Sequence, residues 1–265
     1  MLVYIRELQQ NKKGLIAWTI IIGLMLILMI SLYPEISKNK EAFENMLESM
    51  GTILKVMGMS ELNMDNILNY YSLEGYIMIS LFGSIYAVML SASILSKEQS
   101  EKTVEFLLSK PISRISIVFQ KFLAMLSLII VFNIALSIIV LIMFNIFADT
   151  AISISLFLWI CFAPFMLHIT LASLGFVTSI FIKKSRTSIY YALGIVFVFY
   201  AISIVAGLTD VFSFLKSISP FDYANASTII SNNGMKGHHI FIMIFVMVAS
   251  FVTSVYLFER KNITV

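Results

Sequence analysis

Charged residues are scarce in this sequence. Asp, Glu, Lys and Arg make up 12% of its 265 residues, whereas 59% are hydrophobic. A typical soluble domain carries about 25% charged residues. One soluble core of this size could not bury so much apolar surface, because a large share of any small domain stays in contact with its solvent. The composition therefore excludes an ordinary soluble domain and indicates surroundings that are partly lipid.

Several catalytic and binding motifs are also missing. The sequence contains no Gly-Lys dipeptide, so it lacks the core of a Walker A phosphate loop and cannot bind ATP in that mode. It has no His-Glu-x-x-His and no nucleophile-elbow serine, which argues against an intramembrane protease or esterase. The single cysteine, Cys161, excludes a disulfide within the chain. A net charge of +3 does not point to nucleic acid. We therefore expect no enzymatic activity, metal or cofactor in this chain.

The hydrophobic residues gather in long runs without charge. A helix needs about 20 apolar residues to cross a bilayer core of about 30 Å. Six runs are long enough, at residues 15–33, 75–95, 122–148, 152–182, 187–209 and 240–258. These runs predict an all-α integral membrane protein with six transmembrane helices in a single domain over residues 1–265.

The distribution of Lys and Arg predicts the orientation of the spans, because cytoplasmic segments carry an excess of both. The N-terminus, the 96–121 loop, the 183–187 loop and the C-terminus hold 13 of the 18 Lys and Arg residues. The 34–74, 149–151 and 210–239 segments hold the other 5. Both termini and the 96–121 loop should therefore lie in the cytoplasm.

Three segments outside the spans have helical character. Residues 1–13 predict an amphipathic interfacial helix that enters the first span, with a frayed basic tail as the alternative. Residues 42–64 place Met and Leu at helical spacing and predict an amphipathic outer helix. The 96–121 loop is predicted to form two helices, the first ended by Pro111 and the second capped by Ser113.

The first helix of this loop carries an apolar stripe. Val104, Leu107 and Leu108 form the stripe, with Glu101 and Glu105 elsewhere on the helix. A loop that only joined two spans could be much shorter. The stripe fits a helix that lies on lipid headgroups and equally a helix that docks in the groove of a protein partner.

At this loop the sequence resembles the first cytoplasmic loop of ABC-2 type transporter permeases. The similar residues are Glu101-Lys-Thr-Val-Glu-Phe-Leu-Leu-Ser-Lys-Pro-Ile-Ser-Arg, followed by Phe119-Gln-Lys-Phe-Leu-Ala. Val104 stands where the family often has Leu, and Gln120 where it often has Gly, and both departures are mild. Ser219-Pro-Phe-Asp-Tyr resembles a second family stretch, and six spans with cytoplasmic termini fit the family too.

The resemblance implies partners. Permeases of this family pair in the membrane, so it implies a second permease copy or a paralogue in the lipid bilayer, with separate ABC ATPase subunits that bind ATP and Mg. The 101–114 segment would be a coupling helix between spans two and three, seated in a groove of the ATPase, and the 183–188 loop would add a smaller contact. The residues implied in ATPase coupling are Glu101, Thr103, Val104, Glu105, Leu107, Leu108, Pro111, Arg114, Lys183, Lys184 and Arg186.

Polar residues are few within the spans. No acidic or basic residue lies well inside them, which disfavours an ion-coupled carrier. Asn133, Asn145 and His168 are candidates for a translocation path. Hydrogen bonding between packed helices is the alternative, and we favour it. Pro164 predicts a kink in the fourth span.

We therefore predict the membrane-spanning permease subunit of an ATP-driven exporter, multi-pass in a bacterial plasma membrane. Outward transport follows from the resemblance and not from the residues themselves. Because no charged cavity is evident, the expected cargo is hydrophobic or amphipathic, such as a peptide or a drug. The alternatives are a membrane assembly factor or sensor that transports nothing, and an ion-coupled carrier.

Overall fold

A computed structural model describes most of the chain. The described residues are 2–39, 66–97, 113–148, 152–182, 185–208 and 210–261, with the isolated positions 45, 49 and 51. Over these ranges the regular structure is helical throughout and no strand occurs, which confirms the all-α prediction. The predicted coupling helix and nearly all of the predicted outer helix lie outside the described residues.

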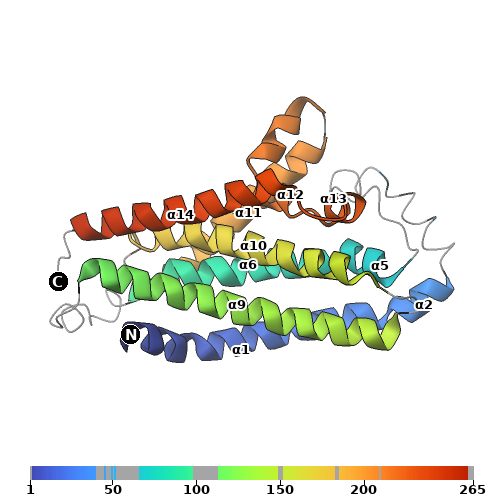
Figure 1. The fold of residues 1–265 in the computed structure, drawn as a ribbon, viewed down its shortest axis with the longest axis horizontal. Coiled ribbons are helices and arrows are strands. Elements are labelled where there is room, and N and C mark those ends of the chain that lie inside the picture. The colour runs from blue at the N-terminus through green and yellow to red at the C-terminus, as the bar shows by residue number, and fades with distance from the viewer. Residues whose placement is uncertain are drawn as a thin grey trace.

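Among the described residues, six helices are long and apolar enough to cross a membrane, as predicted. They are α1 (Leu2–Ser31, continued by α2 at Tyr33–Lys38), α6 (Gly75–Ile94), α9 (Arg114–Phe147), α10 (Ile154–Thr178), α11 (Ser188–Leu208) and α14 (Gly237–Arg260). They form an elongated bundle, and the two ends of the chain lie at the same end of it (Figure 1).

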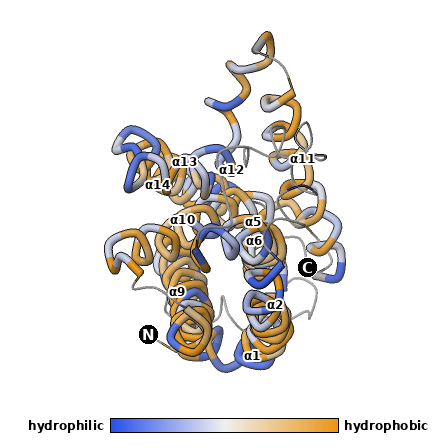
Figure 2. The backbone as a smooth tube through the Cα atoms, turned by 90° about the vertical axis from the view of Figure 1, so that its right-hand side faces the viewer, coloured by the Kyte–Doolittle hydropathy of each residue, from blue (hydrophilic) through white to orange (hydrophobic). Residues whose placement is uncertain are grey.

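Short helices that hydropathy does not predict cover the opposite end of the bundle. These are α2, α5 (Ile67–Leu73), α12 (Pro220–Tyr223) and α13 (Ala226–Ser231) (Figure 1). Three of them are capped by a side chain that accepts a hydrogen bond from a backbone N–H of the first turn. The caps are Asn66 for α5, Ser219 for α12 and Asn225 for α13. Figure 2 looks along the bundle from this end and shows the long helices as mainly hydrophobic, with hydrophilic residues toward their ends.

The centre of the bundle is the pair α6 and α10, which make the most extensive helix contact. In the most apolar 18-residue stretch of each span, 67% of the residues are buried in α6, but only 17% are buried in α11 and in α14. Small residues allow the close approach. A Cβ atom added at Gly83 of α6 would lie 2.5 Å from the His168 ring, and one at Gly175 of α10 would clash with Ser91 Oγ. Pro164 lies inside α10, which continues as one helix past it.

Residues 2–13 are helical, as predicted, and not a frayed tail. They are the first turns of α1, which runs on without a break into the span. The Tyr4 hydroxyl lies 3.0 Å from Ser127 Oγ of α9, and Val3 and Glu7 are buried. This part of α1 packs along α9, and its interfacial placement stays a prediction.

The end of α11 stands apart from the other helices. Figure 1 shows the last turns of α11 and the short helix η2 (Asp210–Ser217) projecting from the side of the bundle. Val211, Phe212 and Phe214 of η2 are exposed. At the other end of α11, the short helix η1 (Ser185–Thr187) leads into the span.

Candidate functional site

The roots of the predicted coupling loop are well defined. α6 ends at Ile94, and the described chain continues to residue 97 and resumes at Ser113. Ser113 Oγ accepts a hydrogen bond from the Ser116 N–H at 3.2 Å, so the predicted cap of the second helix is confirmed. On the α6 side, Ser96 Oγ donates to the carbonyls of Ala92 and Ser93, at 3.3 and 3.1 Å.

A buried ion pair lies beside these roots. Lys121 Nζ of α9 is 2.6 Å from Glu7 Oε1 of α1, and both side chains are only 1% exposed. The same ammonium donates to the carbonyl oxygen of Ile94 at 2.6 Å. Glu7 Oε2 accepts from Asn11 Nδ2 at 3.2 Å. Both carboxylate oxygens therefore have hydrogen-bond partners, as a buried charge requires.

Sequence reasoning missed this pair, although it left a signal. Glu7 lies in the predicted amphipathic helix of residues 1–13, where a carboxylate is expected to face solvent, but it is buried against α9. On α9, Ile117, Val118, Phe122 and Met125 surround Lys121 at helical spacing and are all buried. A lysine at a position that the apolar periodicity assigns to the core indicates a buried partner of opposite charge.

The structure describes Arg114 and Arg186 among the residues implied in coupling. Arg114 Nη1 donates to the carbonyls of Glu259 and Lys261, at 3.1 and 3.0 Å, and so binds the C-terminal end of α14. Arg186 is exposed in η1, which packs against α6. The others lie outside the described residues, namely Glu101, Thr103, Val104, Glu105, Leu107, Leu108, Pro111, Lys183 and Lys184.

Lys261 connects the C-terminal end of α14 to the segment that follows α10. Its ammonium donates to the carbonyl of Ile180, just past the end of that helix. Together, Arg114 and Lys261 join the start of α9, the end of α14 and the end of α10 by bonds to backbone oxygens. Three chain segments therefore meet within hydrogen-bond distance of these two side chains.

Two of the candidate path residues meet in the bundle centre. His168 is fully buried, and its Nε2 donates to the carbonyl of Ile79 at 3.0 Å. Its Nδ1 lies 3.0 Å from Asn133 Oδ1, so the ring joins α10 to α6 and α9. Asn145 is far along α9, exposed, and donates to Leu141 of its own helix. The contacts of His168 and Asn133 are those of helix packing.

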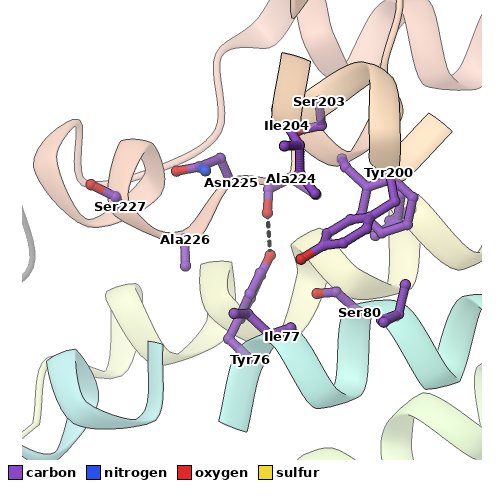
Figure 3. A pocket seen from close by; sticks show the side chains of 13 residues that line it. Tyr76, Ile77, Ser80, Tyr200, Ser203, Ile204, Ala224, Asn225, Ala226 and Ser227 are labelled. Carbon is purple, nitrogen blue, oxygen red and sulfur yellow. Dashed lines mark hydrogen bonds between the residues drawn. The ribbon is translucent and has the colours of Figure 1, made fainter. Parts of the chain in front are cut away.

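A hydroxyl-lined cavity lies between α6, α11 and the α12–α13 segment (Figure 3). It has a volume of about 60 Å³, and the hydroxyls of Tyr76, Ser80, Tyr200 and Ser203 line it. The Tyr76 hydroxyl donates to the Ala224 carbonyl at 2.5 Å, which fixes α12–α13 on α6. Next to the cavity, burial raises the pKa of Asp222 to about 6, against the opposing effects of its hydrogen bond with Ser203 and the charge of Lys216.

A larger, apolar groove lies between α9 and α10. It has a volume of about 480 Å³. Its walls are isoleucine, leucine and phenylalanine side chains, with Asn133, Ser137 and Cys161 as the polar exceptions. No acidic or basic side chain lines either this groove or the hydroxyl-lined cavity.

Comparison with known proteins identifies one family. The family described as "ABC-2 family transporter protein" matches residues 1–263, which is essentially the whole chain. A comparison with curated proteins finds no match. The family match covers all six candidate spans and both roots of the 98–112 loop.

Proposed function

Because this chain belongs to the ABC-2 family of transporter proteins, we propose that it is the membrane-spanning permease subunit of an ATP-driven exporter. The observation that carries the proposal is a family match over residues 1–263 of a chain with six candidate spans. The sequence has no phosphate loop, so ATP and Mg are bound by a separate ABC ATPase. The chain itself has no enzymatic activity and no cofactor.

The ATPase contacts the cytoplasmic end of the bundle. The loop between α6 and α9 docks in a groove of the ATPase through Val104, Leu107 and Leu108, as an amphipathic helix does. Exposed Arg186, whose turn packs against α6, adds a second contact. The excess of Lys and Arg in these loops supports their cytoplasmic placement. It equally supports cytoplasmic termini. The membrane in this proposal is a bacterial plasma membrane.

A second permease, either a copy of this chain or a paralogue, pairs with the α11 face. α11 is among the least buried spans, and Tyr190, Phe197 and Val198 are exposed along it. The face continues into η2, where Val211 is 77% and Phe214 is 62% exposed. η2 follows the last turn of the span, where lipid tails cover apolar side chains less completely than at mid-membrane. A protein partner therefore suits the exposed apolar side chains of η2 better than lipid alone.

ATP binding closes the ATPase subunits, and the loops transmit that movement to the paired membrane domains, which open outward. The cargo is hydrophobic or amphipathic, such as a peptide or a drug. The absence of charged side chains from the two described cavities supports this class, because a charged cargo would leave its charge unpaired there.

Purification from native membranes tests the proposal. The tagged chain should carry with it an ATPase that has a Walker A motif. Reconstituted inside-out vesicles of the complex should then accumulate a fluorescent hydrophobic peptide when ATP is added. The control is the same complex with the Walker A lysine of the ATPase replaced by alanine, which should neither hydrolyse ATP nor transport. A pure chain that binds ATP would contradict the proposal, and uptake driven by an ion gradient without ATP would favour a carrier.

A further inference from the structure

The buried Lys121 ammonium joins three helices at one point. It contacts Glu7 of α1 and the Ile94 carbonyl of α6, each at 2.6 Å, from its own place on α9. Ile94 is the last residue of α6, and the last four carbonyls of a helix have no partner within the helix. A lysine is also favoured at a helix C-terminus by the helix dipole. Both the carboxylate of Glu7 and the carbonyl end of α6 therefore stabilise the Lys121 ammonium at this position.

This point lies at the roots of the 98–112 loop. Ile94 precedes the last described residue before the loop by three positions. Lys121 follows Ser113 by eight positions, which is about 12 Å along a helix. The chain entering the loop and the chain leaving it are thus both held by one side chain. The Tyr4 N–H of α1 also donates to Gln120 Oε1 at 3.4 Å, beside the pair.

An apolar pair would have been the simpler way to pack these helices. Removing two charges from water is costly, and hydrophobic side chains of similar volume often give an equal or greater stability. The charged pair adds a constraint on the relative positions of the three helices, because the ammonium must keep both acceptors within hydrogen-bond distance. Helices joined by apolar contacts can slide past one another, whereas these three cannot do so without losing a buried hydrogen bond.

We propose that Lys121 is a positioning residue, which with Glu7 and the Ile94 carbonyl ties both roots of the loop to α1. A displacement of the loop then moves α1, α6 and α9 as one unit. The role of the tie in transport rests on the proposed function, in which an ATPase displaces the loop. The tie itself is a property of the chain and can be measured without a partner.

The distance between two spin labels measures how firmly α1 is held to the chain that follows α6. The labels are placed at Gln10 and Lys97, in a chain whose Cys161 is replaced by serine, and their distance distribution is recorded in lipid nanodiscs. The distribution should be narrow in the parent chain and at least twofold broader in Glu7→Leu/Lys121→Met, which replaces the pair by apolar side chains. Lys121→Arg keeps two donors and should restore the narrow distribution. An unchanged distribution in the apolar double variant would overturn the proposal.

An exposed ion pair at the opposite end of the bundle provides the matched control. Glu35 and Lys38 of α2 are 3.6 Å apart, and their side chains are 72% and 73% exposed. Glu35→Leu/Lys38→Met makes the same substitutions and should leave the distribution unchanged. If the apolar double variant of Glu7 and Lys121 fails to accumulate, Glu7→Gln/Lys121→Gln takes its place. That variant removes both charges but keeps polar side chains, and the same broadening is expected.

Transport per ATP hydrolysed provides the second measurement, in the complex with its ATPase. The apolar double variant should have the thermal stability of the parent chain but a transport-to-hydrolysis ratio at least tenfold lower, with recovery in Lys121→Arg. A parent-like ratio in a folded double variant would show that the pair only fills space and would overturn the coupling role. If the parent chain captures no ATPase, the proposed function fails, and the spin-label distances still decide whether the tie exists.

Discussion

Replacing Gly83 by alanine is expected to destabilise the contact between α6 and α10. A Cβ atom at this position would lie 2.5 Å from Cε1 and Nε2 of His168. Carbon atoms in good contact are about 3.5–4.0 Å apart, so the ring or the helix must move by about 1 Å. The ring is held in place, because its two nitrogens lie 3.0 Å from the Ile79 carbonyl and from Asn133 Oδ1.

The size of the effect follows from three contributions. Overpacking a well-filled core costs about 1–3 kcal/mol. Weakening one hydrogen bond between membrane helices adds about 0.6 kcal/mol. Alanine is the better helix former and offsets up to about 1 kcal/mol. The free energy of unfolding of Gly83→Ala should therefore be lower than that of the parent chain by about 1–3 kcal/mol.

Unfolding in mixed detergent micelles, with increasing sodium dodecyl sulfate and circular dichroism as the signal, measures this difference. Gly14→Ala is the control, because a Cβ atom there meets nothing within 4 Å. Its stability should stay within about 0.5 kcal/mol of the parent or rise. A double-mutant cycle combines Gly83→Ala with His168→Ala, which removes the ring and with it the clash. The double variant should therefore be at least about 1 kcal/mol more stable than the sum of the two single effects predicts. Additive effects, or a Gly83→Ala variant as stable as Gly14→Ala, would show that no clash with the His168 ring exists.

The other predictions concern the loop, the orientation and the response to pH. Leu107→Asp or Leu108→Asp should leave insertion intact but reduce ATPase capture at matched membrane levels, because burying a leucine is worth about 1.5–3 kcal/mol; normal capture and transport would make the loop a lipid-facing helix. A cysteine at position 38 should be labelled from outside intact cells and one at position 184 should not; labelling at both would contradict the six-span orientation. Burial raises the pKa of Asp222 from 3.8 to about 6, so the folded state should lose stability as the pH rises through this range and regain none above it. Asp222→Asn should abolish that loss, with a Tm advantage above about pH 7 that vanishes near pH 4, and the same Tm difference at both pH values would count against a buried carboxyl.

Composition and charge alone predict the six spans and the helical fold. A lipid solvent leaves no alternative to a helix for a charge-free run of about 20 residues, because each backbone group must find its partner within the segment. The predicted bounds 75–95 and 187–209 differ from α6 (Gly75–Ile94) and α11 (Ser188–Leu208) by one residue at each differing end. The loop motif likewise led to the family that matches residues 1–263.

The ends of α1 and α9 could not be predicted in this way. A bilayer sets the length of the apolar run and says nothing of how far a helix continues beyond it. The apolar runs begin at 122 and 15, whereas α9 begins at Arg114, after its predicted cap, and α1 at Leu2. The two extensions pack against each other, which the hydropathy of the runs does not reveal. Tyr4 and Ser127 are separated by 123 positions, so no local pattern predicts their contact.

Hydropathy and charge are enough to predict a membrane protein with six spanning helices and one elaborate loop, since both act through the solvent and need no knowledge of neighbours. Which polar groups meet depends on the packing of the helices. It paired His168 with Asn133 and left Asn145 facing outward. It also buried Lys121 against Glu7, 114 positions away. A polar side chain in lipid needs a partner, but any of several helices can supply it, and the packing of α1, α6, α9 and α10 makes that choice.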